Sequence, residues 1–295
     1  MQNKFRLRQE APYLLFILPA LIAYTIFVVT PLVLSFRYAF TNWDGVNDPK
    51  WVGFNNFTTA FTDKTMRTAI FNTIKYSVFV PAIVTILAIP LAVLLNMPMR
   101  TRNFQRAAFF FPSVPSALIV GYIWGYILNP TKSGMLNQVL MFFGMEKPLL
   151  FLAKPNLAFP SLIAVAVWQT VGWHACIYLA NLQSIPKDYY EAATIDGANG
   201  WQQFRAITFP MLAPSMTISV MLLLTGSLKV FDLPFALTGG GPGYTTTMIT
   251  QIIITKGVAE KMYGKATALS IIFFGVIFLL TTIQLTIMKK REGKL

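Results

Sequence analysis

Seven long stretches of the chain contain no Asp, Glu, Lys or Arg, and they dominate its hydrophobic pattern. They are residues 11–36, 76–99, 107–131, 155–186, 206–228, 233–255 and 266–288. Each has at least 23 residues, whereas a helix needs about 20 apolar residues to cross the hydrocarbon core of a bilayer. The pattern therefore predicts an all-α membrane protein with several transmembrane helices.

The stretch 233–255 differs from the other six because it contains Thr238-Gly-Gly-Gly-Pro-Gly243. Gly and Pro at this density in contact with lipid would leave backbone polar groups without partners. We expect a loop with a short re-entrant or surface helix there. The remaining stretches predict one transmembrane domain, residues 1–295, with six helices at about 12–36, 76–98, 107–128, 158–182, 207–228 and 266–288.

The basic residues are unevenly distributed and predict the orientation of the helices. Twelve of the 24 Lys and Arg lie in four short segments, 4–8, 100–106, 187–205 and 289–294. Short loops crowded with Lys and Arg stay in the cytoplasm. We therefore expect both termini on the cytoplasmic side of a cell membrane.

The composition excludes several classes of function. Charged residues make up 12% of the chain and hydrophobic residues 55%, whereas about 25% of the residues of a soluble domain are charged. The net charge of +13 accompanies membrane helices, so orientation explains it and no nucleic-acid partner is expected. The single Cys176 and the absence of clustered acidic residues give no metal site, and we identify no catalytic residue.

The predicted spans also lack a visible energy source. They contain no acidic or basic side chain of the kind that marks proton relays, and His174 is their only imidazole. No phosphate-binding G-x-x-x-x-G-K-[ST] motif is present. Sodium coupling through backbone carbonyls stays possible, so an ion-coupled carrier or channel acting alone is the alternative to a transporter driven by another subunit.

Residues 187–205 form the longest predicted cytoplasmic loop, and their pattern indicates two short helices. Pro186 suits a first helical turn, Asp188 and Glu191 favour the positive end of a helix, and Gly197 is a natural C-terminal stop. A second helix is expected from Trp201 to about Phe209. The loop is rich in apolar residues but poor in Lys and Arg, so a protein groove is favoured over a lipid surface or self-packing.

The order of residues in this loop resembles the EAA loop of ABC importer permeases. The matching positions are Glu191, Ala192, Ala193, Asp196, Gly197, Ala198, Phe204, Ile207 and Pro210. Phe209 departs from the Leu usual in that family. The resemblance implies a type I importer permease fold in which 187–205 contains the coupling helix that contacts an ATP-binding subunit.

Further segments are similar to the carbohydrate-uptake branch of that family, of the maltose and glycerol-phosphate type. They include Val52–Phe57, Phe71–Thr73, Arg106–Pro112, Gly134–Asn137 and Leu237–Pro242. The resemblance implies a bacterial or archaeal inner membrane, a second related permease in a heterodimer, two ATPase subunits that bind ATP and Mg, and an extracytoplasmic solute-binding protein. This chain would bind no cofactor, and a sugar, a polyol or glycerol phosphate would be its solute.

The fourth predicted span carries the candidate solute contacts. Gln169, Thr170 and Trp173 are expected on one helix face, with His174 beside it. The family resemblance adds Ser227 and Lys229 from the fifth span. Hydrogen bonding between helices is the alternative role for these polar residues. Lys229 and Asp232, three residues apart, are candidates for an ion pair.

Overall fold

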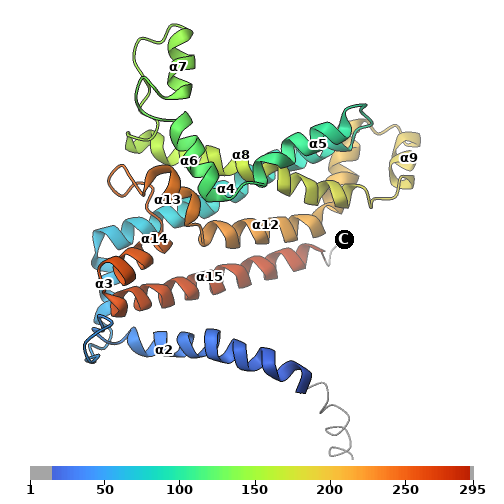
Figure 1. Cartoon of the computed structure of the whole chain (residues 1–295). Coiled ribbons are helices and arrows are strands. Elements are labelled where there is room, and N and C mark those ends of the chain that lie inside the picture. Colours follow the sequence, from blue (N-terminus) through green and yellow to red (C-terminus); the bar gives the residue numbers. More distant parts are fainter. Residues whose placement is uncertain (1–14, 293–295) are drawn as a thin grey trace, which may run out of the picture. The chain divides into compact units, whose positions relative to one another are not determined.

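The computed structural model describes residues 15–292, with side chains to residue 287, and the described part is helical without strands. This agrees with the predicted all-α class. The chain divides into two compact units: residues 1–63 with 253–273, and residues 64–252 with 274–295. The long helices of each are labelled in Figure 1.

Unit 1 contains a helix from Leu15 to Tyr38, which includes η1 (Thr25–Val29) and α2 (Thr30–Tyr38), followed by α3 (Asn55–Thr62). It also contains η4 (Thr255–Ala259) and the first turns of α15 (Tyr263–Glu292). The buried Asn56 amide donates to the carbonyls of Ala39 and Thr41, at 2.9 and 2.7 Å. These bonds fix the connection between α2 and α3.

Trp43 joins the end of α2 to the beginning of α15. Its ring stacks on Tyr38 at 4.0 Å and lies 5.3 Å from Tyr263. Its carbonyl accepts a hydrogen bond of 3.1 Å from the amide of Gly264. The end of one predicted span and the start of another are therefore adjacent within unit 1.

Unit 2 is built around α4 (Lys64–Asn96), α8 (Pro155–Leu182) and α12 (Ala213–Leu228). Their shared core is aliphatic and aromatic, with Val84, Leu162 and Tyr178 fully buried. A Cβ atom added to Gly172 of α8 would lie 1.8 Å from the carbonyl oxygen of Phe109, so glycine permits this close backbone approach.

Two of the six predicted spans are bent. The pair α5 (Arg102–Phe110) and α6 (Ala117–Ile127), with η2 (Phe111–Ser113) between them, bends by 91°. The pair formed by Gly200–Met211 and α12 bends by 64°. Proline lacks the N–H that continues a helix, and Pro112, Pro115 and Pro214 lie at these breaks. In the described part of the chain, four unbroken helices and these two bent pairs are long and apolar enough to cross a membrane.

The glycine-rich interval contains short helices, as its composition predicts. They are α13 (Asp232–Thr238) and α14 (Ile249–Ile254), on either side of the glycine loop. Another short helix, α7 (Met135–Phe142), lies between α6 and α8. Gly121 of α6 faces Ala236 of α13 without room for a Cβ atom, so glycine permits the close approach of these two helices.

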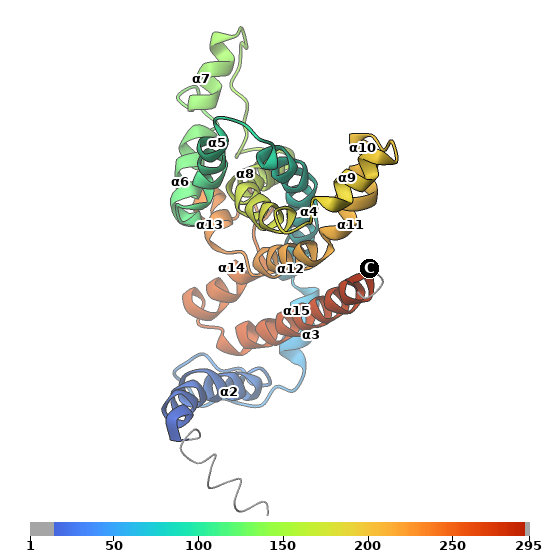
Figure 2. The same ribbon diagram turned by 90° about the vertical axis from the view of Figure 1, so that its right-hand side faces the viewer.

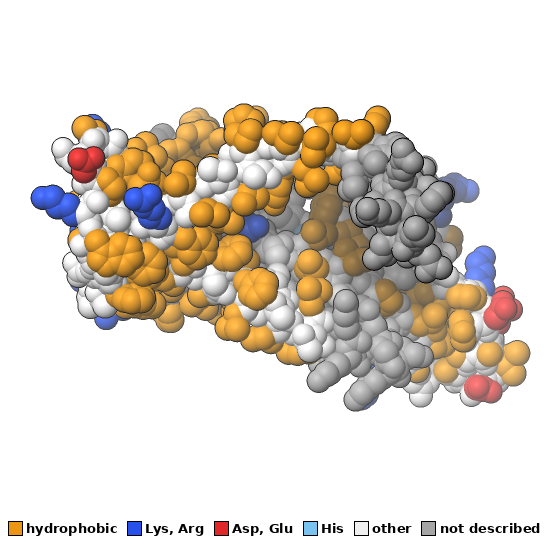
Figure 3. All heavy atoms as spheres, turned by 90° about the horizontal axis from the view of Figure 1, so that it is seen from below, with side chains coloured by type: hydrophobic (Ala, Val, Ile, Leu, Met, Phe, Trp, Pro, Cys, Tyr) orange, Lys and Arg blue, Asp and Glu red, His pale blue; other side chains and the backbone are white. Residues whose placement is uncertain are grey.

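The outer surface of the protein is largely apolar, as a bilayer requires. Hydrophobic side chains predominate on the face drawn in Figure 3, and acidic side chains gather toward its margins. In the helix Leu15–Tyr38, Phe16 is 90% exposed and Phe27 77%. Apolar exposure on this scale is expected where lipid tails replace water.

Candidate functional site

The loop between α8 and α12 folds into a compact helical hairpin, residues 187–211. Its first helix, α9 (Asp188–Ile195), carries Asp188 and Glu191 in its first turn. Gly197 follows with a φ of 78°. The Ala198 amide donates to the Ala193 carbonyl at 2.8 Å, and the Gly197 amide to Thr194 at 3.1 Å. This is the hydrogen-bond pattern of a glycine-terminated helix, as predicted for Gly197.

The second half of the hairpin begins with a capping box. Asn199 and Gln202 exchange side-chain to backbone hydrogen bonds of 2.8 and 3.0 Å at the start of α10 (Gly200–Gln203). The helix continues through η3 (Phe204–Thr208) and α11 (Phe209–Met211). It therefore runs past the predicted end at Phe209, because a π-helical turn precedes Pro210 and accommodates the residue.

Side-chain hydrogen bonds hold the two halves of the hairpin together. The Gln203 amide donates to the Thr194 hydroxyl at 3.0 Å and to the Ala198 carbonyl at 3.2 Å. The hydroxyls of Tyr190 and Thr208 lie 3.0 Å apart. Neither pair was predicted from the sequence, since both depend on how α9 folds back onto the second helix.

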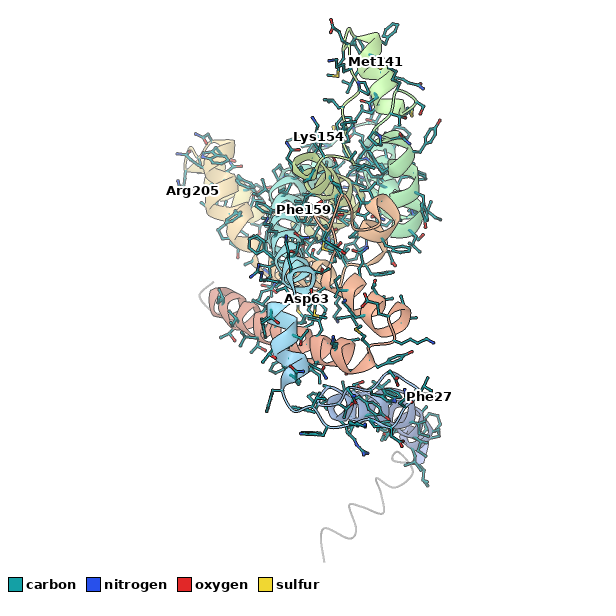
Figure 4. All side chains as sticks on the ribbon, turned by 90° about the vertical axis from the view of Figure 1, so that its left-hand side faces the viewer. Phe27, Asp63, Met141, Lys154, Phe159 and Arg205 are labelled. Atoms are coloured by element: carbon teal, nitrogen blue, oxygen red, sulfur yellow. The ribbon has the colours of Figure 1, made fainter. Side chains whose placement is uncertain are left out.

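The apolar residues of the hairpin divide into two groups. Tyr190, Phe204 and Ile207 are half-buried and pack against the core of unit 2. Ile195 and Trp201 are 86% and 69% exposed. Figure 2 shows α9, α10 and α11 as an arm of this unit, and Figure 4 places Arg205 on that arm. Self-packing therefore accounts for only part of the apolar surface.

The other sequence-predicted residues of the hairpin are mostly accessible. Glu191, Ala192, Asp196 and Gly197 are exposed. Ala193, Ala198 and Pro210 are half-buried. The accessible residues and the exposed apolar ones together form a surface suited to another protein.

A second candidate site is a cavity of about 200 Å³ within unit 2. Helices α4, α6, α8, α12 and α13 contribute to its lining, which comprises Tyr76, Val80, Ala117, Ala166, Gln169, Thr170, His174, Leu222, Leu223, Gly226, Ser227, Val230 and Leu233. Four of the predicted solute contacts, Gln169, Thr170, His174 and Ser227, thus line one cavity. No acidic or basic side chain takes part in this lining.

Three polar residues of the cavity are partly engaged in the bundle. His174 Nδ1 lies 2.8 Å from Ser219 Oγ, Gln169 Nε2 donates to the Pro115 carbonyl at 3.3 Å, and Thr170 donates to its own helix. Hydrogen bonding between helices is therefore a real role for His174 and Gln169. In the described part of the chain, the Ser227 hydroxyl has no such partner, so it is available to a solute.

Trp173 and Lys229 lie outside the cavity lining. The Trp173 ring is 38% exposed and meets the His174 ring edge-on, with 4.7 Å between centroids. Helical spacing placed Trp173 with Gln169, but the spacing does not indicate which part of that face the neighbouring helices cover. Lys229 is exposed, and among the described residues it forms no ion pair with Asp232.

Tyr76 lines the cavity although the sequence did not single it out. It is buried, and its hydroxyl has no hydrogen-bond partner among the described residues. The sequence could have indicated Tyr76 only as a tyrosine within a stretch that lacks charged residues. Tyr24 and Tyr178 also lie in such stretches, so this feature does not select Tyr76. Only the packing of α4 against α8 and α12 distinguishes Tyr76.

The fold and these two sites define a polytopic membrane subunit with an internal cavity and a protruding helical hairpin. Residues 65–292 match the family of the binding-protein-dependent transport system inner membrane component. The chain belongs to this family. It is 36% identical to the probable starch degradation products transport system permease protein AmyD of Thermoanaerobacterium thermosulfurigenes, over 95% of this chain and 94% of that protein.

Two further relatives agree with this assignment. The multiple sugar-binding transport system permease protein MsmF of Streptococcus mutans is 34% identical, over 94% of this chain and 95% of that protein. A chain of the crystal structure of a bacterial ABC transporter involved in the import of the acidic polysaccharide alginate is 25% identical, with a TM-score of 0.87 and coverage of 98% and 99%. The predicted importer permease fold is thereby confirmed.

Proposed function

We propose that this chain is one permease of a heterodimeric, ATP-driven importer for a neutral sugar or polyol. A solute-binding protein delivers the solute outside the membrane. Two ATPase subunits, which bind ATP and Mg, act on this chain through the hairpin 187–211. The chain itself binds no cofactor and catalyses no reaction.

The observation that carries the coupling role is the rigid hairpin with its uncovered apolar residues. Its ends are capped and its halves are hydrogen-bonded, so it can transmit a displacement to α12 as a unit. Burying Ile195 and Trp201 in a partner is favourable, because each removes a large apolar side chain from water. A partner that contacts the hairpin differently in two states shifts the equilibrium between those states.

The contacts within each unit support cytoplasmic termini. The Trp43 carbonyl, just after the helix Leu15–Tyr38, accepts a hydrogen bond from Gly264 at the start of α15, so within unit 1 these two helix ends lie on one side of the membrane. Figures 1 and 2 show the last turns of α15 at the end of unit 2 that carries α9. An ATPase reaches α9 from the cytoplasm, and the termini belong on that side.

The composition of the cavity supports a neutral solute. Its polar lining consists of hydroxyl, amide and imidazole groups, which match the hydroxyls of a sugar or a polyol. A phosphate group bound in this cavity would meet no Lys or Arg side chain of this chain. Burying a charge away from water without a partner costs free energy. The relatives AmyD and MsmF are named for starch products and multiple sugars. Glycerol phosphate is therefore the less favoured solute.

Reconstitution tests this proposal against a carrier acting alone. Proteoliposomes that contain this chain, the second permease, the ATPase and the binding protein should accumulate a labelled neutral sugar only with ATP. This chain alone should give no uptake under a sodium or proton gradient. Gradient-driven uptake by the isolated chain would refute the importer function.

A matched pair of variants tests the solute site in the complete importer. Ser227→Ala removes a hydroxyl that has no partner in the described bundle and should raise the KM for the binding protein loaded with sugar. Thr217→Ala removes a hydroxyl that bonds only within α12 and should leave the KM unchanged. Equal KM values for both variants would remove Ser227 from the solute path.

A further inference from the structure

The glycine loop between α13 and α14 is a small, internally hydrogen-bonded structure in unit 2. The Thr238 and Thr246 hydroxyls lie 2.6 Å apart. Thr246 donates to the Gly241 carbonyl at 2.8 Å, and Thr247 donates to the Gly240 carbonyl at 2.9 Å. These bonds make residues 238–247 a preformed unit.

Two neighbouring side chains of α4 fasten this loop. The buried Asn72 amide donates to the carbonyls of Tyr244 and Thr247, at 2.8 and 3.1 Å. The buried Thr73 hydroxyl accepts the Ile249 amide at 3.0 Å and donates to Ala69 within α4. The contact between α4 and the loop thus includes three hydrogen bonds supplied by two adjacent residues.

The fastened loop lies next to the solute cavity. Tyr76 lines the cavity and follows Asn72 by one helical turn, about 6 Å along the axis. Val230 and Leu233 also line the cavity, and the Val230 carbonyl accepts a hydrogen bond of 2.5 Å from Thr250, just beyond the loop.

We propose that residues 238–250 form the outer gate of the cavity and that Asn72 and Thr73 are the positioning residues that hold this gate shut. In the proposed orientation, α4 begins on the outer side, so the loop covers the end of the cavity that faces the binding protein. Because the loop is bonded internally, it moves as one body when the bonds to α4 break. Few bonds hold it, so a modest rearrangement of α4 relative to α13 opens the cavity.

Thiol accessibility tests the gate in the complete importer. Ser227→Cys in a Cys176→Ala background places a reporter thiol in the cavity, and a membrane-impermeant cationic methanethiosulfonate is added outside sealed vesicles. Asn72→Asp replaces the donor amide with a group that repels both carbonyls, and Thr73→Val removes the hydroxyl at nearly constant volume. Either change should accelerate labelling roughly tenfold, the effect of losing about one hydrogen bond.

Thr68→Val is the matched control, because the Thr68 hydroxyl bonds only to Lys64 within α4. It should label at the parent rate. Unchanged labelling in both Asn72→Asp and Thr73→Val, in complexes of normal assembly and thermal stability, would overturn the proposal. Equal acceleration in Thr68→Val would also overturn it, because a general loosening of α4 would then explain the rate.

The gate inference rests on the proposed importer function for its orientation, but the labelling reaction requires no transport. Absence of ATP-driven uptake would therefore refute the function, whereas unchanged labelling would refute the gate. If Asn72→Asp prevents assembly of the importer, Thr73→Val still decides the question. The labelling rate of Thr73→Val then shows whether the Thr73 hydroxyl holds the loop.

Discussion

Gly197 offers a quantitative test of the hairpin because its backbone conformation is unfavourable for residues with a Cβ atom. Its φ is 78°, and a Cβ atom added there would meet nothing within 4 Å. Gly197→Ala therefore introduces no clash and isolates the cost of the left-handed conformation, about 1–2 kcal/mol for a residue with a Cβ atom. A cost of this size lowers the population of the closed hairpin about 5- to 30-fold.

Gly200 supplies the matched control within the same hairpin. It also has free space around an added Cβ atom, but it lies in α10 without a positive φ. Alanine at such a helical position is favoured over glycine by about 0.5–1 kcal/mol. Gly200→Ala should therefore stabilise the hairpin slightly, and the two variants should differ by about 2 kcal/mol.

Hydrogen exchange and transport measure the two consequences in the assembled importer. The amide of Ala198, which closes the glycine-terminated turn, should exchange about 5- to 30-fold faster in Gly197→Ala. ATP-driven uptake should fall in that variant, while the affinity of the binding protein for its sugar stays the same. Equal exchange and equal uptake in Gly197→Ala and Gly200→Ala would refute the role of this turn in coupling.

Three further experiments test packing, the hairpin and the turn at Asp44. Gly172→Leu should destabilise the purified chain by about 1–3 kcal/mol in thermal unfolding, whereas Gly275→Leu, with open space around its Cβ atom, should not. Tyr190→Phe should cost about 0.5–1.5 kcal/mol and reduce ATP-driven uptake without loss of assembly; full uptake would contradict this role. The backbone amide of Asn47, among other donors, lowers the pKa of Asp44 to about 2. The turn is therefore retained above the ordinary value of 3.8 and lost as the pH falls through about 2, which amide exchange measured against pH would reveal.

Local features of this protein follow from the sequence because they depend on neighbouring residues. Charge-free stretches predict membrane helices, since each helix must meet the bilayer by itself. Gly197 ends α9 as expected, because its turn closes through bonds between residues at most five positions apart. The glycine-rich interval was predicted to contain a short helix for the same kind of reason.

Properties that depend on contacts between distant segments required the tertiary structure. Helical spacing grouped Trp173 with Gln169, but the arrangement of α4, α12 and α13 decides that Gln169 faces the cavity and Trp173 does not. The bend of 91° between α5 and α6 was likewise not predicted, because a proline allows a helix to break without fixing its new direction. Asn72 lies in a segment that resembles the family, but the sequence assigned it no role. Its role follows from the fold, which brings it beside a loop more than 170 positions away. Sequence therefore determines which segments enter the membrane, whereas packing determines which polar groups meet there.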